Sequence, residues 1–190
     1  MRLRTVIDWL LSVRPADPSR PVSISLAGGT EREQSGRDQL RRLLKDDNLR
    51  KWQYTNRVRI EQGVISHSHP VLTLNARHLE DDSLALSAYL HEQLHWFVWR
   101  RIRKKRRAMR ELRQRYPNPP SARGGDESST YLHFLICYLE YRAMIEAVGR
   151  EEARRVIEFL STDHYTEIYK TVLRDFDEIG EIAARHALAP

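Results

Sequence analysis

The residues His91-Glu92-Gln93-Leu94-His95 place two histidines and a glutamate at a spacing that can do chemistry. On a helix, residues four apart share a face with their Cβ atoms about 6 Å apart, so both imidazoles can reach one metal ion. Imidazole nitrogens are common ligands of Zn²⁺, with bonds of about 2.0–2.1 Å. A glutamate directly after the first ligand can take the proton of a metal-bound water. The pattern predicts one zinc ion held by His91 and His95, with Glu92 as the catalytic base.

Uncharged side chains flank this pattern on both sides, among them Tyr89, Leu90, Trp96 and Phe97. This part of the helix can therefore be buried, as a water-excluding metal site requires. The alternative is a pair of core histidines beside a buried glutamate, with no metal.

A hydrolytic zinc needs a third protein ligand and an open position for water. The segment 131–148 is apolar apart from a few polar residues, and Glu140 lies in its middle. A buried carboxylate is costly unless a positive charge meets it, so Glu140 is the first candidate. His133 is the alternative third ligand. Because the two are separated by about 10.5 Å along a helix axis, we expect only one of them to bind the ion.

Three features together resemble the zincin metallopeptidases: HEQLH at 91–95, the strand-like VLTLN before it, and Glu140-Tyr141-Arg142-Ala143 after it. The E-x-x-A arrangement is similar to that of the gluzincins, especially their small single-domain members. The resemblance covers about residues 70–148. It implies a zinc metalloprotease, a hydrolase that cleaves peptide bonds of a peptide or protein substrate. It also implies that strand 71–75 binds the substrate in extended form. Many gluzincins have an acidic residue four positions after the glutamate, where this chain has Met144.

Zinc peptidases also need a donor for the developing oxyanion. His164, Tyr165 and Tyr169 lie just before or inside the expected last helix and are candidates for this role. His164 and Tyr165 lie at the helix start, from which a side chain could turn over a cleft. The alternative is that all three are surface or packing residues.

A basic run follows the metal-binding pattern: residues 100–115 hold ten Arg or Lys and one acid, in a chain of net charge +6. If the metal-bearing helix ends near residue 103, the cations of residues 100–107 would cap it and remain in water, because cations interact favourably with the dipole at a helix C-terminus. The alternative is a surface that binds a nucleic acid or an anionic membrane. It would comprise Arg103, Lys104, Lys105, Arg106 and Arg107. No helix-turn-helix, zinc-finger or RNP motif is present and no aromatics are interleaved, so nucleic-acid binding is not favoured.

Composition and length bound the class of protein. The chain has 190 residues, 41% hydrophobic and 31% charged, which is typical of one folded domain. Cys137 is the only cysteine, which suits a reducing cytoplasm. Asp8 interrupts the apolar N-terminus, which favours an amphipathic helix over a secretory leader. Segment 131–148 holds too many polar groups for a transmembrane helix. We therefore expect a cytoplasmic protein.

The predicted architecture is α+β, with a small, mainly antiparallel sheet followed by helices. An N-terminal helix and proline-rich connector occupy 1–20, a sheet region with one helix 21–80, and a helical region 81–190 that carries the HExxH helix. Together they would form a single zincin-like domain. The expected strands are 22–26, 54–61, 64–68 and 71–75, with a tight turn at Gln62-Gly63. The expected helices are 30–47, 82 into the basic run, 127–148, 150–160 and 166–186.

Two other classes of function remain open from the sequence. One is a nucleic-acid-associated protein whose zinc site is structural. The other is a protein-interaction domain that keeps the zincin shape with a non-catalytic zinc site.

Overall fold

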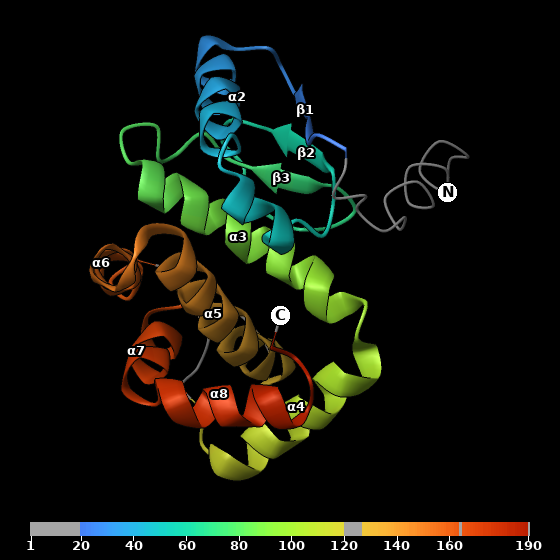
Figure 1. The fold of residues 1–190 in the computed structure, drawn as a ribbon, viewed down its shortest axis with the longest axis vertical. Helices are drawn as coiled ribbons and strands as arrows, with labels where there is room; N and C mark the ends of the chain where they lie inside the picture. Colours follow the sequence, from blue (N-terminus) through green and yellow to red (C-terminus); the bar gives the residue numbers. More distant parts are fainter. Residues whose placement is uncertain (1–19, 120–126, 164, 190) are drawn as a thin grey trace. The chain divides into compact units, whose positions relative to one another are not determined.

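The computed structural model of this chain describes residues 20–119, 127–163 and 165–189 (Figure 1). The N-terminal helix expected within 1–20 and the candidate His164 lie outside the described residues. None of the described helices is long and apolar enough to cross a membrane. The elements in chain order are β1 (Ser23–Leu26), α2 (Glu31–Leu43), the 3₁₀ helix η1 (Asp47–Trp52), β2 (Arg57–Ile60), β3 (Leu72–Leu74), α3 (Asp82–Trp99), α4 (Ile102–Arg115), α5 (Glu127–Val148), α6 (Arg150–Leu160), α7 (Thr166–Arg174) and α8 (Phe176–Arg185).

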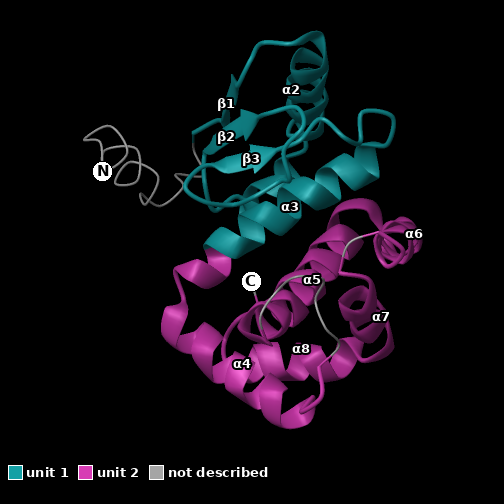
Figure 2. Cartoon of the chain, turned by 180° about the vertical axis from the view of Figure 1, so that it is seen from behind, with its two compact units in different colours: residues 1–96 teal, residues 97–190 magenta. Residues whose placement is uncertain are grey.

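The chain divides into two compact units, residues 1–96 and 97–190 (Figure 2). Unit 1 holds the sheet and most of α3, and unit 2 holds the end of α3 and the helices that follow. The single zincin-like domain over 1–190 stays a prediction.

The sheet of unit 1 is parallel, so the predicted antiparallel sheet is wrong. Its three strands have the order β1-β2-β3, and both neighbouring pairs run parallel. Parallel neighbours need a crossover, and α2 with η1 supplies it between β1 and β2. The chain still has the predicted α+β class, with a small sheet and many helices. The predicted antiparallel strand direction is wrong.

Helix α2 begins where the sequence indicated. Thr30 is its N-cap, and the Thr30 hydroxyl accepts a hydrogen bond from the backbone N–H of Glu33 at 3.2 Å. The Glu33 carboxylate accepts hydrogen bonds from the N–H groups of Gly28 and Gly29, at 2.8 and 2.7 Å. Gly36 lets α2 approach the sheet, because a Cβ there would lie 3.3 Å from Ile60 of β2.

The segment 64–68, expected as a strand paired with 54–61, pairs with β3 instead. His67 and Thr73 exchange two backbone hydrogen bonds of 2.9 and 2.8 Å in an antiparallel bridge. The N–H of Asn75 also donates to the Ser66 hydroxyl at 3.1 Å. The turn at Gln62-Gly63 therefore does not close a hairpin between β2 and the segment after it.

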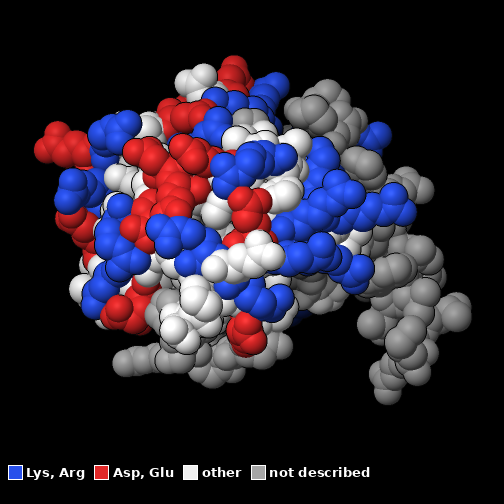
Figure 3. Space-filling view, turned by 90° about the horizontal axis from the view of Figure 1, so that it is seen from below, with Lys and Arg blue, Asp and Glu red and all other residues white. Residues whose placement is uncertain are grey.

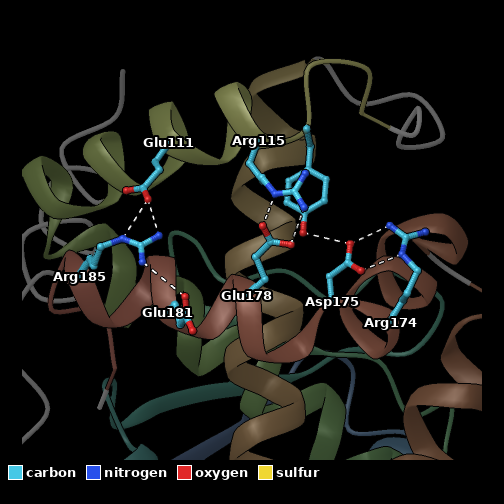
Figure 4. Close-up of polar contacts among 8 residues, drawn as sticks. Glu111, Arg115, Arg174, Asp175, Glu178, Glu181 and Arg185 are labelled. Carbon is cyan, nitrogen blue, oxygen red and sulfur yellow. Dashed lines mark hydrogen bonds and ion pairs between the residues drawn. The ribbon is translucent and has the colours of Figure 1, made fainter.

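Unit 2 is a group of helices around α5, which α4, α6, α7 and α8 contact. The middle of α5 is buried on all sides: Phe134, Leu135, Ile136 and Leu139 have no exposed surface. Gly149, with φ +86°, ends α5 and allows α6 to start at the next residue. The break lies between the expected helices 127–148 and 150–160. Surface ion pairs join α4 to α8, namely Arg115–Glu178 and Glu111–Arg185 (Figure 4).

Two predicted helices are each divided. The metal-bearing helix ends at Trp99, and a separate helix, α4, begins at Ile102. Arg101 marks this break: it leaves helical geometry at φ −112°, ψ 42°, and its guanidinium donates to the Phe97 carbonyl at 3.1 Å. The helix expected over 166–186 breaks at Asp175, with φ −113° and ψ 31°.

Candidate metal centre

The two histidines of the H-E-x-x-H pattern converge on α3. Their Nε2 atoms lie 3.3 Å apart, and their ring centroids 5.1 Å apart. Two ligands at about 2.0–2.1 Å from a tetrahedral ion are themselves about 3.3–3.4 Å apart. The spacing of His91 and His95 therefore fits a shared zinc ion.

The surroundings of this pair exclude most water. His91 is 9% exposed and Glu92 is 7% exposed, and Leu90 and Leu94 are fully buried. Because hydrogen bonds and charges act more strongly where water is excluded, this is a suitable environment for a metal-bound water and a base. Glu92 is thus buried beside the first histidine, as the sequence predicted for this part of the helix.

Gln93, one of the two unspecified positions of the pattern, fixes α3 to the segment before β2. Its side-chain oxygen accepts from the backbone N–H groups of Tyr54 and Thr55, at 2.7 and 2.9 Å. Its side-chain nitrogen donates to the Thr55 carbonyl at 3.0 Å and to the Tyr89 hydroxyl at 2.9 Å. Gln93 has no exposed surface. These bonds hold the rotation of α3 about its axis, and with it the direction of both histidines.

Trp96 fixes the next turn of α3 to the loop before β3. Its indole N–H donates to the Ser68 carbonyl at 2.8 Å, and the His69 ring stacks on it with centroids 4.2 Å apart. His69 therefore has a packing contact beside the metal-binding turn.

Strand β3 does not offer the open edge that the resemblance implied for an extended substrate. Thr73 is the β3 residue whose backbone groups face away from β2, and both are bonded to His67. Segment 64–68 therefore covers this edge, and a peptide could pair there only after displacing it.

In unit 2, Glu140 lies in a buried polar group with Tyr169 and Cys137. The Tyr169 hydroxyl donates to the Glu140 carboxylate at 2.8 Å, and Glu140 is 1% exposed. Burial, and then the charges of Cys137 and Glu140, raises the pKa of Tyr169 well above its usual value. Burial, and then the charge of Glu140, also raises the pKa of the Cys137 thiol. Cys137 is fully buried, and its interpretation as a small packing side chain that binds no metal stays a prediction.

His133, two turns before Glu140 on α5, is held by its own contacts. Its Nδ1 is 2.7 Å from the Ser129 carbonyl, so Nδ1 carries the proton and Nε2 is the acceptor nitrogen. The Tyr165 ring stacks on the His133 ring with centroids 4.0 Å apart. Tyr165 has a left-handed backbone, φ 51° and ψ 34°, at the start of α7. The candidate oxyanion donor Tyr165 thus lies against the alternative third ligand.

Most of the basic run lies beyond the end of α3. Arg101 donates to the Phe97 carbonyl at the end of α3, whereas the residues from Arg103 to Arg107 lie in the first turns of α4. We predicted that the cations of residues 100–107 cap the C-terminus of the helix that carries His91 and His95. For residues 103–107 this prediction is wrong, because α3 ends at Trp99. Figure 3, a view from below of Figure 1, shows Lys and Arg side chains gathered on one side with few acidic groups among them.

Comparisons with protein families, with curated proteins and with solved structures find no match for this chain. The zincin resemblance therefore rests on the motif and its surroundings alone. The sequence did not indicate Gln93, because a buried amide inside the motif has no sequence signal of its own. Tyr169 was a candidate oxyanion donor from the sequence, and in the structure its hydroxyl donates to the Glu140 carboxylate instead.

Proposed function

We propose that this protein is a zinc-dependent hydrolase, a metallopeptidase acting on a peptide or protein substrate. The observation that carries the proposal is the 3.3 Å separation between the Nε2 atoms of His91 and His95. It fits two ligands of one tetrahedral ion and lies at the long end of the range for a hydrogen bond between two rings. The burial of Glu92 in the same helical turn supports the assignment.

Glu140 is the proposed third ligand, and His133 the alternative. A carboxylate buried as deeply as that of Glu140 is destabilising unless it is ionised against a positive charge or hydrogen-bonded. Tyr169 supplies one hydrogen bond, and a ligand oriented by a hydrogen bond from its other side is common around protein-bound zinc. The alternative has a comparable support, because the Ser129 carbonyl fixes the tautomer of His133 that could bind a metal through Nε2.

In the proposed peptide hydrolysis, zinc, Glu92 and Tyr165 would each have a separate role. Zinc, when bound, lowers the pKa of water and polarises a carbonyl. Glu92 would accept the proton of the attacking water and pass it to the leaving amine, acting first as base and then as acid. The hydroxyl of Tyr165 is the proposed donor to the developing oxyanion. A single, buried free cysteine is consistent with the proposed cytoplasmic location.

A matched pair of variants tests the proposal. Zinc-loaded wild type, Glu92→Gln and His95→Ala are assayed against a mixture of unstructured peptides, with cleavage followed by mass spectrometry. We expect Glu92→Gln to keep its zinc and to lose turnover by at least about 100-fold, because a general base contributes about 10²–10⁴. His95→Ala should lose both zinc and turnover. Cleavage by Glu92→Gln at the wild-type rate would contradict the proposed mechanism.

A further inference from the structure

A row of four arginines lies along the exposed face of α4. Arg103, Arg106, Arg107 and Arg110 are all exposed. They have the i, i+3, i+4, i+7 spacing of one helical face. The opposite face packs into unit 2, where Ala108 and Leu112 have no exposed surface. We call these four residues the arginine row.

The arginine row differs from the other end of the same helix. Within residues 20–119, 127–163 and 165–189, no carboxylate forms a described ion pair with any member of the row. The last turns of α4 are paired: Glu111 with Arg185, Arg113 with Glu127, and Arg115 with Glu178 (Figure 4). The helix is thus anchored at its C-terminal end by charge pairs and presents uncompensated charge at its N-terminal end.

This charge opposes the stability of the helix. The first turn of α4 contains no acid, and its N-cap makes no side-chain hydrogen bond. A cation in the first turn of a helix, here Arg103, is unfavourable by about 0.3–1 kcal/mol, and the like charges at i, i+4 in the row add to the cost. Lys105 responds to the same surroundings, because burial and then the neighbouring charge of Arg106 lower its pKa. A role in folding therefore does not explain the arginine row.

We propose that the arginine row binds the phosphate backbone of a nucleic-acid duplex, without reading its bases. The row extends about 10.5 Å along the helix axis, and duplex DNA carries about one charge per 1.7 Å, so several phosphates face the four guanidiniums. Guanidinium groups bind phosphates in a bidentate manner. Arginine can read guanine, but the row contains no amide or aromatic side chain to read other bases or stack on them. We therefore assign its contacts to the phosphates, which carry no sequence information. A membrane-surface helix would expose a continuous apolar face, whereas Ala108 and Leu112 of α4 are buried in unit 2 and Ile102 is its one exposed large apolar side chain.

Fluorescence anisotropy with a labelled DNA duplex of mixed sequence tests this proposal. The row variant replaces Arg103, Arg106, Arg107 and Arg110 by Gln. The control variant removes the same charge from four exposed, acid-paired positions: Arg41, Arg154, Arg155 and Lys170. In wild type and control, we expect binding to fall by at least about 100-fold between about 50 and 200 mM salt. In the row variant, the slope of log Kd against log salt should decrease by about 3.6, at about 0.9 per lost contact.

Three results would overturn the proposal: no duplex binding by wild type at low salt, equal loss in both variants, or binding to phosphatidylserine vesicles in place of the duplex. Thermal unfolding provides a second readout. Because the row opposes helix stability, the row variant should be at least as stable as wild type. A destabilised row variant would show that the arginines serve the fold, against the proposal.

Discussion

The Nε2 atoms of His91 and His95 lie 3.3 Å apart on consecutive turns of α3. A helix alone brings the Cβ atoms of such a pair to about 6 Å, so the rings must also turn toward one another to reach this distance. Gln93 and Trp96 restrain the same stretch of α3 on its other faces, through Thr55 and Ser68. The proposed metal centre requires such a restraint, because ligands held in place need no further ordering when an ion binds.

Removing the Gln93 amide should loosen the metal-binding helix. Gln93→Ala leaves the buried backbone groups of Tyr54 and Thr55 without their partners. An unsatisfied buried group costs about 1–3 kcal/mol, so we expect unfolding free energy to fall by about 2–4 kcal/mol. Urea unfolding measures this, with the exposed Gln114→Ala as control. Equal stability of the two variants would show that the bonds of Gln93 do not hold α3.

The hydroxyl of Tyr169 should matter for zinc affinity if Glu140 is a ligand. Tyr169→Phe removes the hydrogen bond to the Glu140 carboxylate. Loss of such an orienting bond weakens metal binding by about 10–100-fold. Competition with a chelator measures the Kd for zinc, and Tyr141→Phe removes another hydroxyl, from α5 itself, as the control. Unchanged affinity in Tyr169→Phe, with zinc lost in His133→Ala, would make His133 the third ligand instead.

Acid should weaken unit 2 through Asp175. The hydrogen bond from Arg174 lowers the pKa of Asp175, burial opposes this, and the Tyr116 hydroxyl adds to the lowering. Because the folded-state pKa is depressed, the stabilisation is complete above the unfolded-state pKa of about 3.9 and is lost as pH falls through the folded-state pKa. The difference in unfolding free energy between wild type and Asp175→Asn, up to about 1 kcal/mol, should therefore shrink below about pH 4. Urea unfolding from pH 2 to 7 tests this, with exposed Asp177→Asn as control; a difference independent of pH would refute it.

Gly180 in α8 has a packing reason to lack a side chain. A Cβ there would lie 2.7 Å from the Tyr138 hydroxyl and 3.1 Å from two ring carbons. Alanine is favoured over glycine in a helix by about 1 kcal/mol, whereas overpacking a core costs about 1–3 kcal/mol. We expect Gly180→Ala to destabilise unit 2 by about 1 kcal/mol in thermal unfolding, and Tyr138→Phe to recover part of this. A more stable Gly180→Ala would contradict the close packing of α8 on α5.

Helix positions in this chain were predictable because the local signals are strong. The expected helices 127–148 and 150–160 have the bounds that the structure gives α5 and α6, and the helix expected from residue 30 begins one residue later as α2. Strand direction was not predictable in the same way. Strands of three or four residues alternate equally well in either direction, and the turn at Gln62-Gly63 favoured a hairpin. All three residues of β3 are buried in the structure, which is typical of parallel sheets, but the alternating sequence LTL does not show this burial.

Part of the candidate site could be predicted from local sequence, and part depends on residues far apart in the chain. The histidine spacing is a property of one helix and was readable from the sequence. Gln93 bonds to Tyr54 and Thr55, which are 39 and 38 residues away in the sequence. Glu140 bonds to Tyr169, which is 29 residues away. No local pattern predicts such pairs. The break at Arg101 was also hidden, since the residues from 82 to 115 contain neither proline nor glycine.

Metal analysis of the purified protein tests the central claim most directly. Protein dialysed against a trace of zinc, with free metal removed, should hold about one zinc per chain by inductively coupled plasma mass spectrometry. His91→Ala and His95→Ala should each reduce this content to background, while Gln114→Ala, which removes an exposed side chain, should leave it unchanged. Zinc content that is the same in wild type and both histidine variants would contradict the proposed metal centre.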